Sequence, residues 1–347
     1  MNSRENTLRS YRFLGPERIP IEMNLSLNCW NQMDAVALEQ AVRDHPILFP
    51  GFDGRPKELD FAPWRRRGVR HRDSWGCVWE TNQDGMTGAV VERSLPDWSL
   101  LESFRPPDSG LHNGWQEIEW NTIEANLSEA RRTGRLTQGS LRHGHTFLTM
   151  EFMRGFENLV YDMCDERQEF ETLVRMVEEF NAGIVERYLE IGVDIMGYPE
   201  DLGSGNQVLI SPDLFRRWIK PVYTRLMRPA RSRNVLVHMH SDGHIMEIVD
   251  DLVDCGVDII NLQDLVNGVD NIAREIKGRM AVSLDIDRQQ IVRFGTPRDI
   301  DDHIRAVVDK LNDPAGGLSL HHGLYPGIPI ENATALMDAM EHYSVIS

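Results

Sequence analysis

The sequence predicts a (β/α)8 barrel of the TIM-barrel class, formed as a single domain over residues 1–347. From about residue 183 the apolar pattern alternates between helical and strand periods, which is typical of βα units on a parallel sheet. Eight apolar segments have the character of strands, and a closed parallel barrel of this class needs eight. The length of 347 residues fits one domain, because α/β barrels often exceed 250 residues as one unit.

The eight predicted strands are short apolar runs between turn residues. Short runs of this kind are typical of strands that are buried on both faces of a parallel sheet. In chain order they cover residues 19–25, 76–80, 147–152, 193–197, 235–239, 257–262, 280–284 and 317–320.

Long amphipathic helices separate most of these strands. They are predicted at residues 165–190, 212–231, 245–254, 269–277, 297–311 and 329–342. Ser211 and Thr296 each precede a proline, so a hydroxyl caps the helix and proline takes its first position. Gly192 and Gly256 each stand between a helix and a strand, where we expect a left-handed helix cap.

One stretch does not fit the alternation. Residues 84–114 contain Pro96, Pro106, Pro107 and several tryptophans without a clear period. We interpret this stretch as an insertion over the barrel mouth that covers the substrate.

Composition limits the partners and the compartment. A net charge of −17 makes a general attraction to nucleic acid or anionic lipid improbable, so small molecules or proteins are the expected partners. No apolar run reaches about 18 residues and the N-terminus lacks a signal-peptide pattern, which predicts a cytoplasmic protein without membrane spans. The four cysteines show no CxxC spacing and are expected to be reduced thiols.

The strongest chemical signal is a strand end rich in imidazole and carboxylate groups. His238, His240 and Asp242 alternate along the predicted strand 235–239 and its extension, so their side chains share one face. Nitrogen and oxygen donors at this spacing can hold a metal ion or handle protons. A second imidazole pair, His321 and His322, ends another strand. Two such ends that converge on one cavity would form an active site.

Other polar and aromatic residues follow predicted strands, and each has a structural alternative. Asp201 either caps a turn or acts on the substrate or a proton. Asp285 either pairs with Arg288 or binds a cation or works in acid–base catalysis. Residues expected to line the site are Gln263, Trp75 and Tyr325, with packing as the alternative for both aromatics, and His238 either orients His240 or packs in the core.

Several motifs resemble one known superfamily. The segment Tyr198-Pro-Glu-Asp201-Leu-Gly-Ser, the segment from Gln207 to Ser211 and the motif His240-Ser-Asp-Gly-His-Ile resemble the central signature of the uroporphyrinogen decarboxylase superfamily. This superfamily contains uroporphyrinogen decarboxylases and cobalamin-linked methyltransferases that act on methanol, methylamine, chloromethane or aryl methyl ethers, all on one barrel fold. The resemblance extends over nearly the whole chain and implies that Gln207 contributes to substrate binding.

The methyltransferase branch binds zinc through a His-x-Cys pair and a distant cysteine. His240 matches the histidine, while Asp242 and His322 stand where the two cysteines would be, and Glu151 is the expected fourth ligand. A set of this kind can still bind zinc with an open position, but it favours oxygen chemistry over thiolate alkylation. The resemblance then implies a metal-dependent methyltransferase or demethylase that moves a methyl group from a small substrate to a corrinoid carried by a partner protein.

The decarboxylase branch is the alternative. His322-Gly-Leu-Tyr325-Pro resembles its terminal His-Gly-Met-Tyr-Pro motif, and Asp73 matches its aspartate. Two features depart from that branch: residues 22–28 lack the arginine-rich loop, and Glu151 replaces a tyrosine. Both departures would repel a substrate with many carboxylates.

Three functions therefore stay open at this point. The leading hypothesis is the metal-dependent methyltransferase, the second is uroporphyrinogen III decarboxylation, and the third is a non-catalytic protein that binds a corrinoid or tetrapyrrole. Whether the protein forms a homodimer is left open. The residues expected to be catalytic, either in proton transfer or at the substrate, are Asp73, Asp201, Asp285 and His322.

Overall fold

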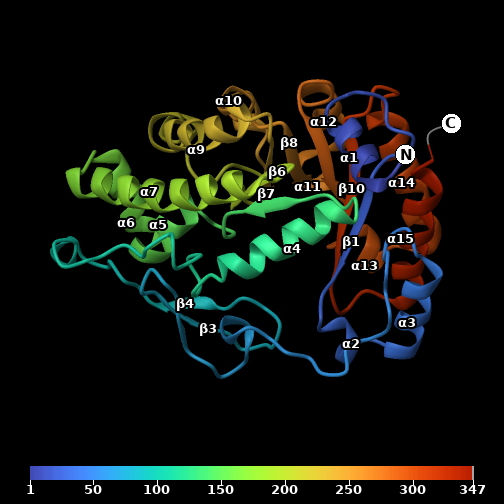
Figure 1. Ribbon diagram of the computed structural model, residues 1–347, viewed down its shortest axis with the longest axis horizontal. Coiled ribbons are helices and arrows are strands. Elements are labelled where there is room, and N and C mark those ends of the chain that lie inside the picture. The colour runs from blue at the N-terminus through green and yellow to red at the C-terminus, as the bar shows by residue number, and fades with distance from the viewer. Residues whose placement is uncertain (346–347) are drawn as a thin grey trace. The chain divides into compact units, whose positions relative to one another are not determined.

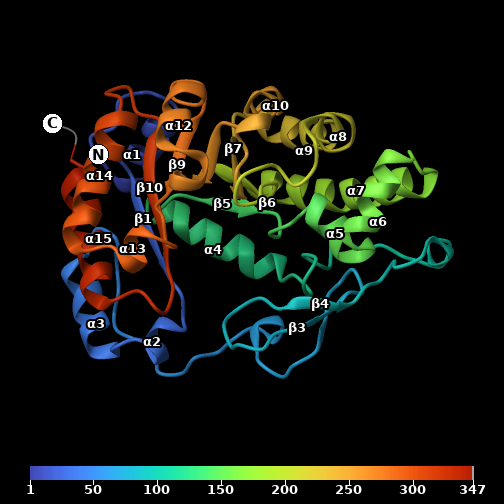
Figure 2. The ribbon, with the colours of Figure 1, turned by 180° about the vertical axis from the view of Figure 1, so that it is seen from behind.

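The computed structural model describes residues 1–345, and the chain divides into two compact units. Unit 1 contains Met1–Ala62 and Ile260–Ser347, and unit 2 contains Pro63–Ile259. Figures 1 and 2 show the elements of each unit from opposite sides. Strand β8 (Ile259–Gln263) begins at the boundary between the units.

In unit 1, three parallel strands are paired in a fixed order. Strand β10 (Leu318–Leu324) lies between β1 (Ile21–Leu25) and β9 (Ala281–Asp285). Helices α14 and α15 pack side by side (Figures 1 and 2). The helices of this unit are α1 (Ser3–Tyr11), α2 (Cys29–Gln32), α3 (Ala35–Asp44), α11 (Asp264–Asn267), α12 (Val269–Glu275), α13 (Ile291–Phe294), α14 (Pro297–Leu311) and α15 (Ile330–Tyr343).

Unit 2 contains a second parallel set, with β6 (Ile195–Asp201) between β5 (Gln138–Ser140) and β7 (Leu236–Asp242). A π-helical segment, Phe215–Ile219, joins two of its helices. The helices are α4 (Trp120–Arg132), α5 (Phe147–Arg154), α6 (Phe156–Cys164), α7 (Gln168–Ile191), α8 (Pro212–Leu214), α9 (Lys220–Ser232) and α10 (Val249–Cys255).

Unit 2 also carries a small antiparallel sheet of β2 (His71–Arg72), β3 (Val78–Glu80) and β4 (Ala89–Glu92). The prediction that residues 76–80 form a barrel strand is therefore wrong, because β3 pairs antiparallel with its sequence neighbours β2 and β4. Gly76, with φ at +84°, forms part of the turn that precedes β3. A short apolar run does not reveal whether its partners are parallel or antiparallel.

The predicted strand at residues 147–152 is also wrong, because this segment forms helix α5. Phe147, Met150 and Met153 are buried at a helical spacing of three, and a run of this length fits either structure from its sequence. The strand that precedes α5 is β5, whose three residues, Gln138 to Ser140, are not an apolar run. Among residues 1–345 the parallel strands therefore number seven, where eight were predicted.

The remaining predicted strands and helices are confirmed, with shifts of a few residues at their ends. The Thr296 side chain accepts a hydrogen bond from the Asp299 amide, and Asp299 reciprocates, so α14 begins with a capping box. Ser211 caps α8 more simply, because its side chain accepts a hydrogen bond from the Leu214 amide. Gly256 takes the predicted left-handed conformation. Gly192 has φ at +85° but ψ at 103°, so it does not form the predicted left-handed helix cap.

The stretch 84–114 contains β4 and loops that are tied to α5 and α6. Arg154 donates hydrogen bonds to the carbonyl oxygens of Leu95 and Pro96, and Trp98 Nε1 donates to Asp162. Its predicted role as a cover over the substrate stays a prediction. The four cysteines form no disulfide in the part of the chain that is described. No described helix has the length and apolar character needed to cross a membrane.

Candidate metal centre

The carboxyl ends of β6 and β7 lie side by side in unit 2. Their register pairs Pro199 with His240 and Asp201 with Asp242. Along β7, His240 and Asp242 are partly exposed, whereas Met239 and Ser241 are buried. The two polar side chains therefore share one face of the strand, as their spacing predicts.

Three donor groups meet at these strand ends: His143, Asp201 and His240. His143 Nε2 lies 3.2 Å from Asp201 Oδ1, and His240 Nε2 lies 3.6 Å from the same oxygen. Each residue offers a ligand atom within 4.8 Å of the other two. We call this set the His–Asp–His group.

Asp242 borders the group without being one of its three members. Its backbone N–H donates to Asp201 Oδ1 over 3.0 Å, and its own Oδ1 lies 3.7 Å from His240 Nε2. The Asp242 side chain is 39% exposed, so a substrate can reach it. Asp242 thus holds Asp201 in place through its amide and presents a carboxylate at the same edge.

The sequence analysis does not identify His143. It lies between β5 and α5, in residues 141–146, and the strand that places it is too short and too polar to recognise. The signal that could have found it is the pair His143 and His145 around Gly144, directly before an apolar run. Imidazoles that follow a strand in this way are candidates for a site at the carboxyl end of a parallel sheet.

The charges of the group stabilise one another. Burial alone would raise the pKa of Asp201, but the hydrogen bond from His143 and the nearby His143 and His240 charges outweigh it and lower this pKa. Burial alone would lower the pKa of His143, but the hydrogen bond and charge of Asp201 outweigh it and raise this pKa. Without a metal ion, each of the two side chains therefore favours the charged form of the other.

The donor set fits a divalent cation such as zinc. Two imidazole nitrogens and one carboxylate oxygen are a common ligand set for catalytic zinc, which keeps a further position open. The side chains of His143, Asp201 and His240 are 49%, 28% and 20% exposed, so an ion and a substrate can enter.

A close backbone contact supports this strand edge. Gly243 has φ at +80°, and a Cβ atom added there would lie 2.1 Å from the carbonyl carbon of Gly203. Gly203 N also donates to the carbonyl oxygen of Asp242. The two chain segments approach so closely only because both residues are glycines.

We therefore expect Gly243→Ala to lower the free energy of unfolding by about 2 kcal/mol or more, because it combines backbone strain with a backbone clash. Zinc affinity should fall with it, since Asp242 adjoins the displaced segment. Urea unfolding and zinc titration measure both effects. Gly205→Ala is the matched control, because a Cβ atom there meets nothing within 4 Å. Equal stability of the two variants would contradict the expectation.

The other predicted residues of unit 2 have varied surroundings. Glu151 lies on α5, with Oε1 3.7 Å from an Arg93 nitrogen, and burial raises its pKa. Trp75 is buried edge-on against Phe180. Gln207 is exposed. Its backbone carbonyl oxygen accepts hydrogen bonds from the amide and the hydroxyl of Ser204.

Asp73 is enclosed in a buried network. It accepts hydrogen bonds from the Cys77 amide, Trp79 Nε1 and Arg142. The side chains of Asp73 and Arg142 are 1% and 3% exposed, and the guanidinium carbon lies 4.2 Å from the centre of the Trp115 ring. These contacts favour a structural role for Asp73.

The remaining predicted residues belong to unit 1. Asp285 ends β9 and pairs with Arg288 over 3.2 Å, as its structural alternative predicts, and Arg288 in turn lies over the Tyr325 ring. Gln263 and Asp285 line the same small cavity.

His322 is fully buried, and its Nδ1 lies 3.1 Å from the Ile286 carbonyl oxygen. Because a carbonyl oxygen only accepts, Nδ1 carries the proton of a neutral ring.

We expect His322 to make the protein sensitive to acid. Burial lowers the pKa of His322 from 6.5 to about 4, so the unfolded chain takes up a proton first as the pH falls through this window. The contribution of neutral His322 to the free energy of unfolding is therefore fully present above pH 6.5. About 2–3 kcal/mol of this free energy is lost by pH 4.5. Urea unfolding of metal-free protein at pH 7 and 4.5 should show a smaller loss for His322→Gln than for the wild type. The same loss in both would contradict this.

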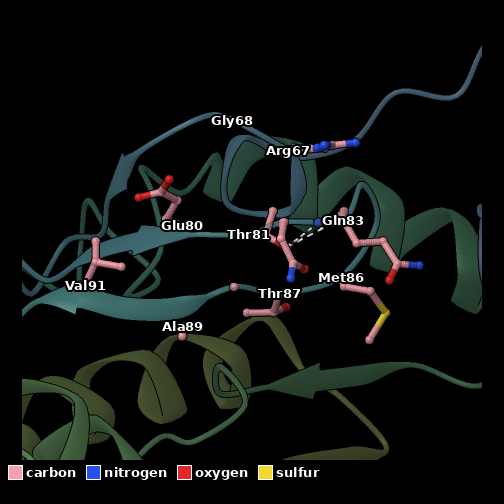
Figure 3. Close-up of a pocket in the computed structure, with 11 residues that line it drawn as sticks. Arg67, Gly68, Glu80, Thr81, Gln83, Met86, Thr87, Ala89 and Val91 are labelled. Atoms are coloured by element: carbon pink, nitrogen blue, oxygen red, sulfur yellow. Dashed lines mark hydrogen bonds between the residues drawn. The ribbon is translucent and has the colours of Figure 1, made fainter.

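A separate cavity of about 760 Å³ lies at the small antiparallel sheet. Figure 3 shows Thr81 and Gln83 joined by hydrogen bonds within it, with Met86 and Thr87 nearby. The residues that line it come from positions 67–91 and include none of the predicted site residues.

Comparisons with known proteins identify one family. The model of the uroporphyrinogen decarboxylase (URO-D) family matches residues 144–343. The methylcobamide:CoM methyltransferase MtaA of Methanosarcina barkeri is 24% identical over 183 residues, which cover 50% of this chain and 49% of that protein. A uroporphyrinogen decarboxylase of Coxiella burnetii is 23% identical over 219 residues, covering 60% of this chain and 54% of that protein. The chain thus spans about half the length of these curated relatives.

A solved structure is similar over almost the full chain. The methyltransferase from Methanosarcina mazei has a TM-score of 0.69 and 14% sequence identity, and the match covers 99% of each chain. Similarity at this identity shows the fold alone, and it confirms the predicted barrel class.

Proposed function

Since this chain belongs to the uroporphyrinogen decarboxylase family, we propose that it is a metal-dependent enzyme that moves a methyl group from a small substrate to a corrinoid. The observation that carries the proposal is the His–Asp–His group, in which three residues from two strand ends and one loop present ligand atoms within 4.8 Å of one another. Packing alone does not require such a gathering of donors at a strand edge.

The proposed ligands are His143, Asp201 and His240. Zinc bound there would act as a Lewis acid on a substrate oxygen or nitrogen. Of these three ligands, His240 is also expected from the sequence, whereas His143 and Asp201 are not expected as metal ligands. Asp242 is close enough to His240 to serve as a further oxygen ligand. Glu151 and His322 stay predicted ligands.

The protein's own groups have separate tasks in this proposal. The Asp242 amide holds Asp201 Oδ1, so the carboxylate keeps its orientation toward both imidazoles. The partly exposed Asp242 carboxylate lies beside the group, where it can relay a proton to the leaving atom of the substrate. Asp285, in unit 1, stays a predicted proton carrier, and it forms an ion pair with Arg288.

The proposed reaction is balanced with a methyl ether and a cob(I)alamin. The carbon–oxygen bond of the ether breaks, and the two electrons of cobalt form the new cobalt–carbon bond. The substrate oxygen keeps the electrons of the broken bond and takes up one proton. A methylamine would react in the same way, with nitrogen as the leaving atom. The expected partner is a protein that carries the corrinoid.

Decarboxylation is the competing function, and the surroundings of Asp73 argue against it. In that function Asp73 would bind the pyrrole nitrogens of the substrate. Here its two oxygens already accept three hydrogen bonds inside a buried aromatic cluster. This arrangement supports the transferase proposal over the tetrapyrrole alternative.

An anaerobic assay tests the proposed function. Zinc-loaded protein is mixed with cob(I)alamin and a panel of methyl ethers and methylamines, and methylcobalamin is followed by its absorbance. We expect transfer from at least one donor and its loss after chelation of zinc. Release of carbon dioxide from uroporphyrinogen with no methyl transfer would favour the decarboxylase, and corrinoid binding without turnover of either substrate would favour the non-catalytic binder.

A further inference from the structure

We propose that Glu200 is a positioning residue of the metal centre, which holds His143 in place by anchoring the amino end of helix α5. The inference rests on the proposed metal site and adds a residue to it. Glu200 lies next to Asp201 at the end of β6, and successive side chains of a strand point to opposite faces. One strand end thus supplies a metal ligand on one face and an anchor on the other.

Glu200 is fully buried and accepts four hydrogen bonds. Its Oε2 accepts from the backbone N–H groups of Thr146 and Phe147, both over 2.9 Å, and from the hydroxyl of Tyr223 over 3.0 Å. Its Oε1 accepts from the N–H of Leu148 over 3.2 Å. The Glu200 side chain, which lies at the end of β6, therefore caps the amino end of α5.

Helix α5 lacks a cap of its own. The first N–H groups of a helix have no partner within the helix, and the side chain of the N-cap residue, Thr146, makes no capping bond. Glu200 satisfies three of these donors. It also places two acceptor oxygens at the positive end of the helix dipole.

The anchored helix start is tied directly to His143. The connection from β5 runs through residues 141–146, so His143 is three residues from the first amide that Glu200 binds. Further bonds fix the same connection to β6 and α5: Gly144 N donates to the carbonyl oxygen of Pro199, and Thr149 Oγ1 donates to that of Gly144. A change at Glu200 should therefore reach His143 through a short, well-bonded path.

Replacement by glutamine removes this anchor with little change in volume. One oxygen becomes an NH2 group, which cannot accept from an amide, so at least one backbone donor of α5 loses its bond. Groups that orient a metal ligand from outside typically change metal affinity by about 10–100-fold when mutated.

The test is a double-mutant cycle on zinc affinity, measured by competition with a chromophoric chelator on the full chain. Glu200→Gln is expected to weaken zinc binding by about 10–100-fold. In a His143→Ala background the same change should have no further effect, because the ligand that Glu200 positions is gone. Asp194→Asn is the matched control: Asp194 also binds a backbone amide, that of Thr137, but at the amino end of β6. It should leave zinc affinity unchanged.

Tyr223→Phe provides a second variant in case the glutamine variant does not fold, since it removes one of the four donors and keeps the carboxyl group. It should cause a smaller loss of zinc affinity, again absent in the His143→Ala background. A loss that persists in that background would mean that Glu200 acts on the whole fold, and an affinity equal to the wild type in both variants would also overturn the inference. A wild-type protein that binds no zinc would overturn the proposed function as well, so the two failures can be told apart.

Discussion

His240→Ala is expected to lower zinc affinity by more than 100-fold. It removes a ligand outright, and even residues that only orient a ligand change affinity by about 10–100-fold. His240 Nε2 lies within 3.7 Å of both Asp201 and Asp242, so its loss removes the only imidazole that β7 brings to the His–Asp–His group. The measurement is chelator competition at fixed pH, because imidazole binds metal only when it is deprotonated.

Two variants make this result specific. Asp201→Asn should produce a similar loss, because an amide oxygen without charge replaces the carboxylate that both imidazoles approach. His342→Ala removes an exposed histidine of α15 and should leave zinc affinity as it is. An affinity for His240→Ala within a few-fold of the wild type would place the metal elsewhere.

Asp73→Ala is expected to destabilise the protein by about 3–5 kcal/mol, because it leaves the buried Arg142 guanidinium without its carboxylate. The Cys77 amide and Trp79 Nε1 lose their acceptor in the same step. Urea unfolding followed by tryptophan fluorescence measures the change. Glu129→Ala, which breaks an exposed pair with Arg132, is the control and should have little effect.

The same variant separates the structural role of Asp73 from the catalytic role expected from the sequence. A structural role lowers stability and leaves the zinc affinity of the folded fraction unchanged. If Asp73→Ala instead unfolds at the same urea concentration as the wild type and loses only turnover, Asp73 belongs to the chemistry.

Much of the fold could be predicted because helix signals are local. Helix α14 begins and ends where its capping box and apolar period place it, at Pro297 and Leu311. Gly256 ends α10 in the left-handed conformation, which a helix-to-strand junction favours. These features depend on a few consecutive residues, so they can be predicted from the local sequence alone.

Two of the errors, at residues 147–152 and at β5, occur where partners are distant in sequence. The run at 147–152 is short and apolar, and only its burial against the rest of unit 2 makes it the helix α5. Strand β5 has three residues, and its pairing with β6 rather than its composition makes it a strand. These two errors are linked, because the strand predicted at residues 147–152 takes the place of β5 in the expected order of strands.

The candidate site shows the same division. His240 and Asp242 could be found because they end an apolar run at alternate positions. His143 does not end an apolar run, and its place depends on β5 and on the burial of Glu200 against the start of α5. Asp73 follows a family pattern, yet its buried bonds to Arg142 and Trp79 are visible only in three dimensions.

The most direct measurement is the metal content of the untagged protein, purified without chelators and analysed by elemental mass spectrometry. A variant that carries His143→Ala, Asp201→Asn and His240→Ala together is prepared in parallel, and circular dichroism verifies that it is folded. We predict near-stoichiometric zinc in the wild type and only a trace in the folded variant. Equal metal content in the two proteins, or no metal in the wild type, would contradict a metal centre at the ends of β6 and β7.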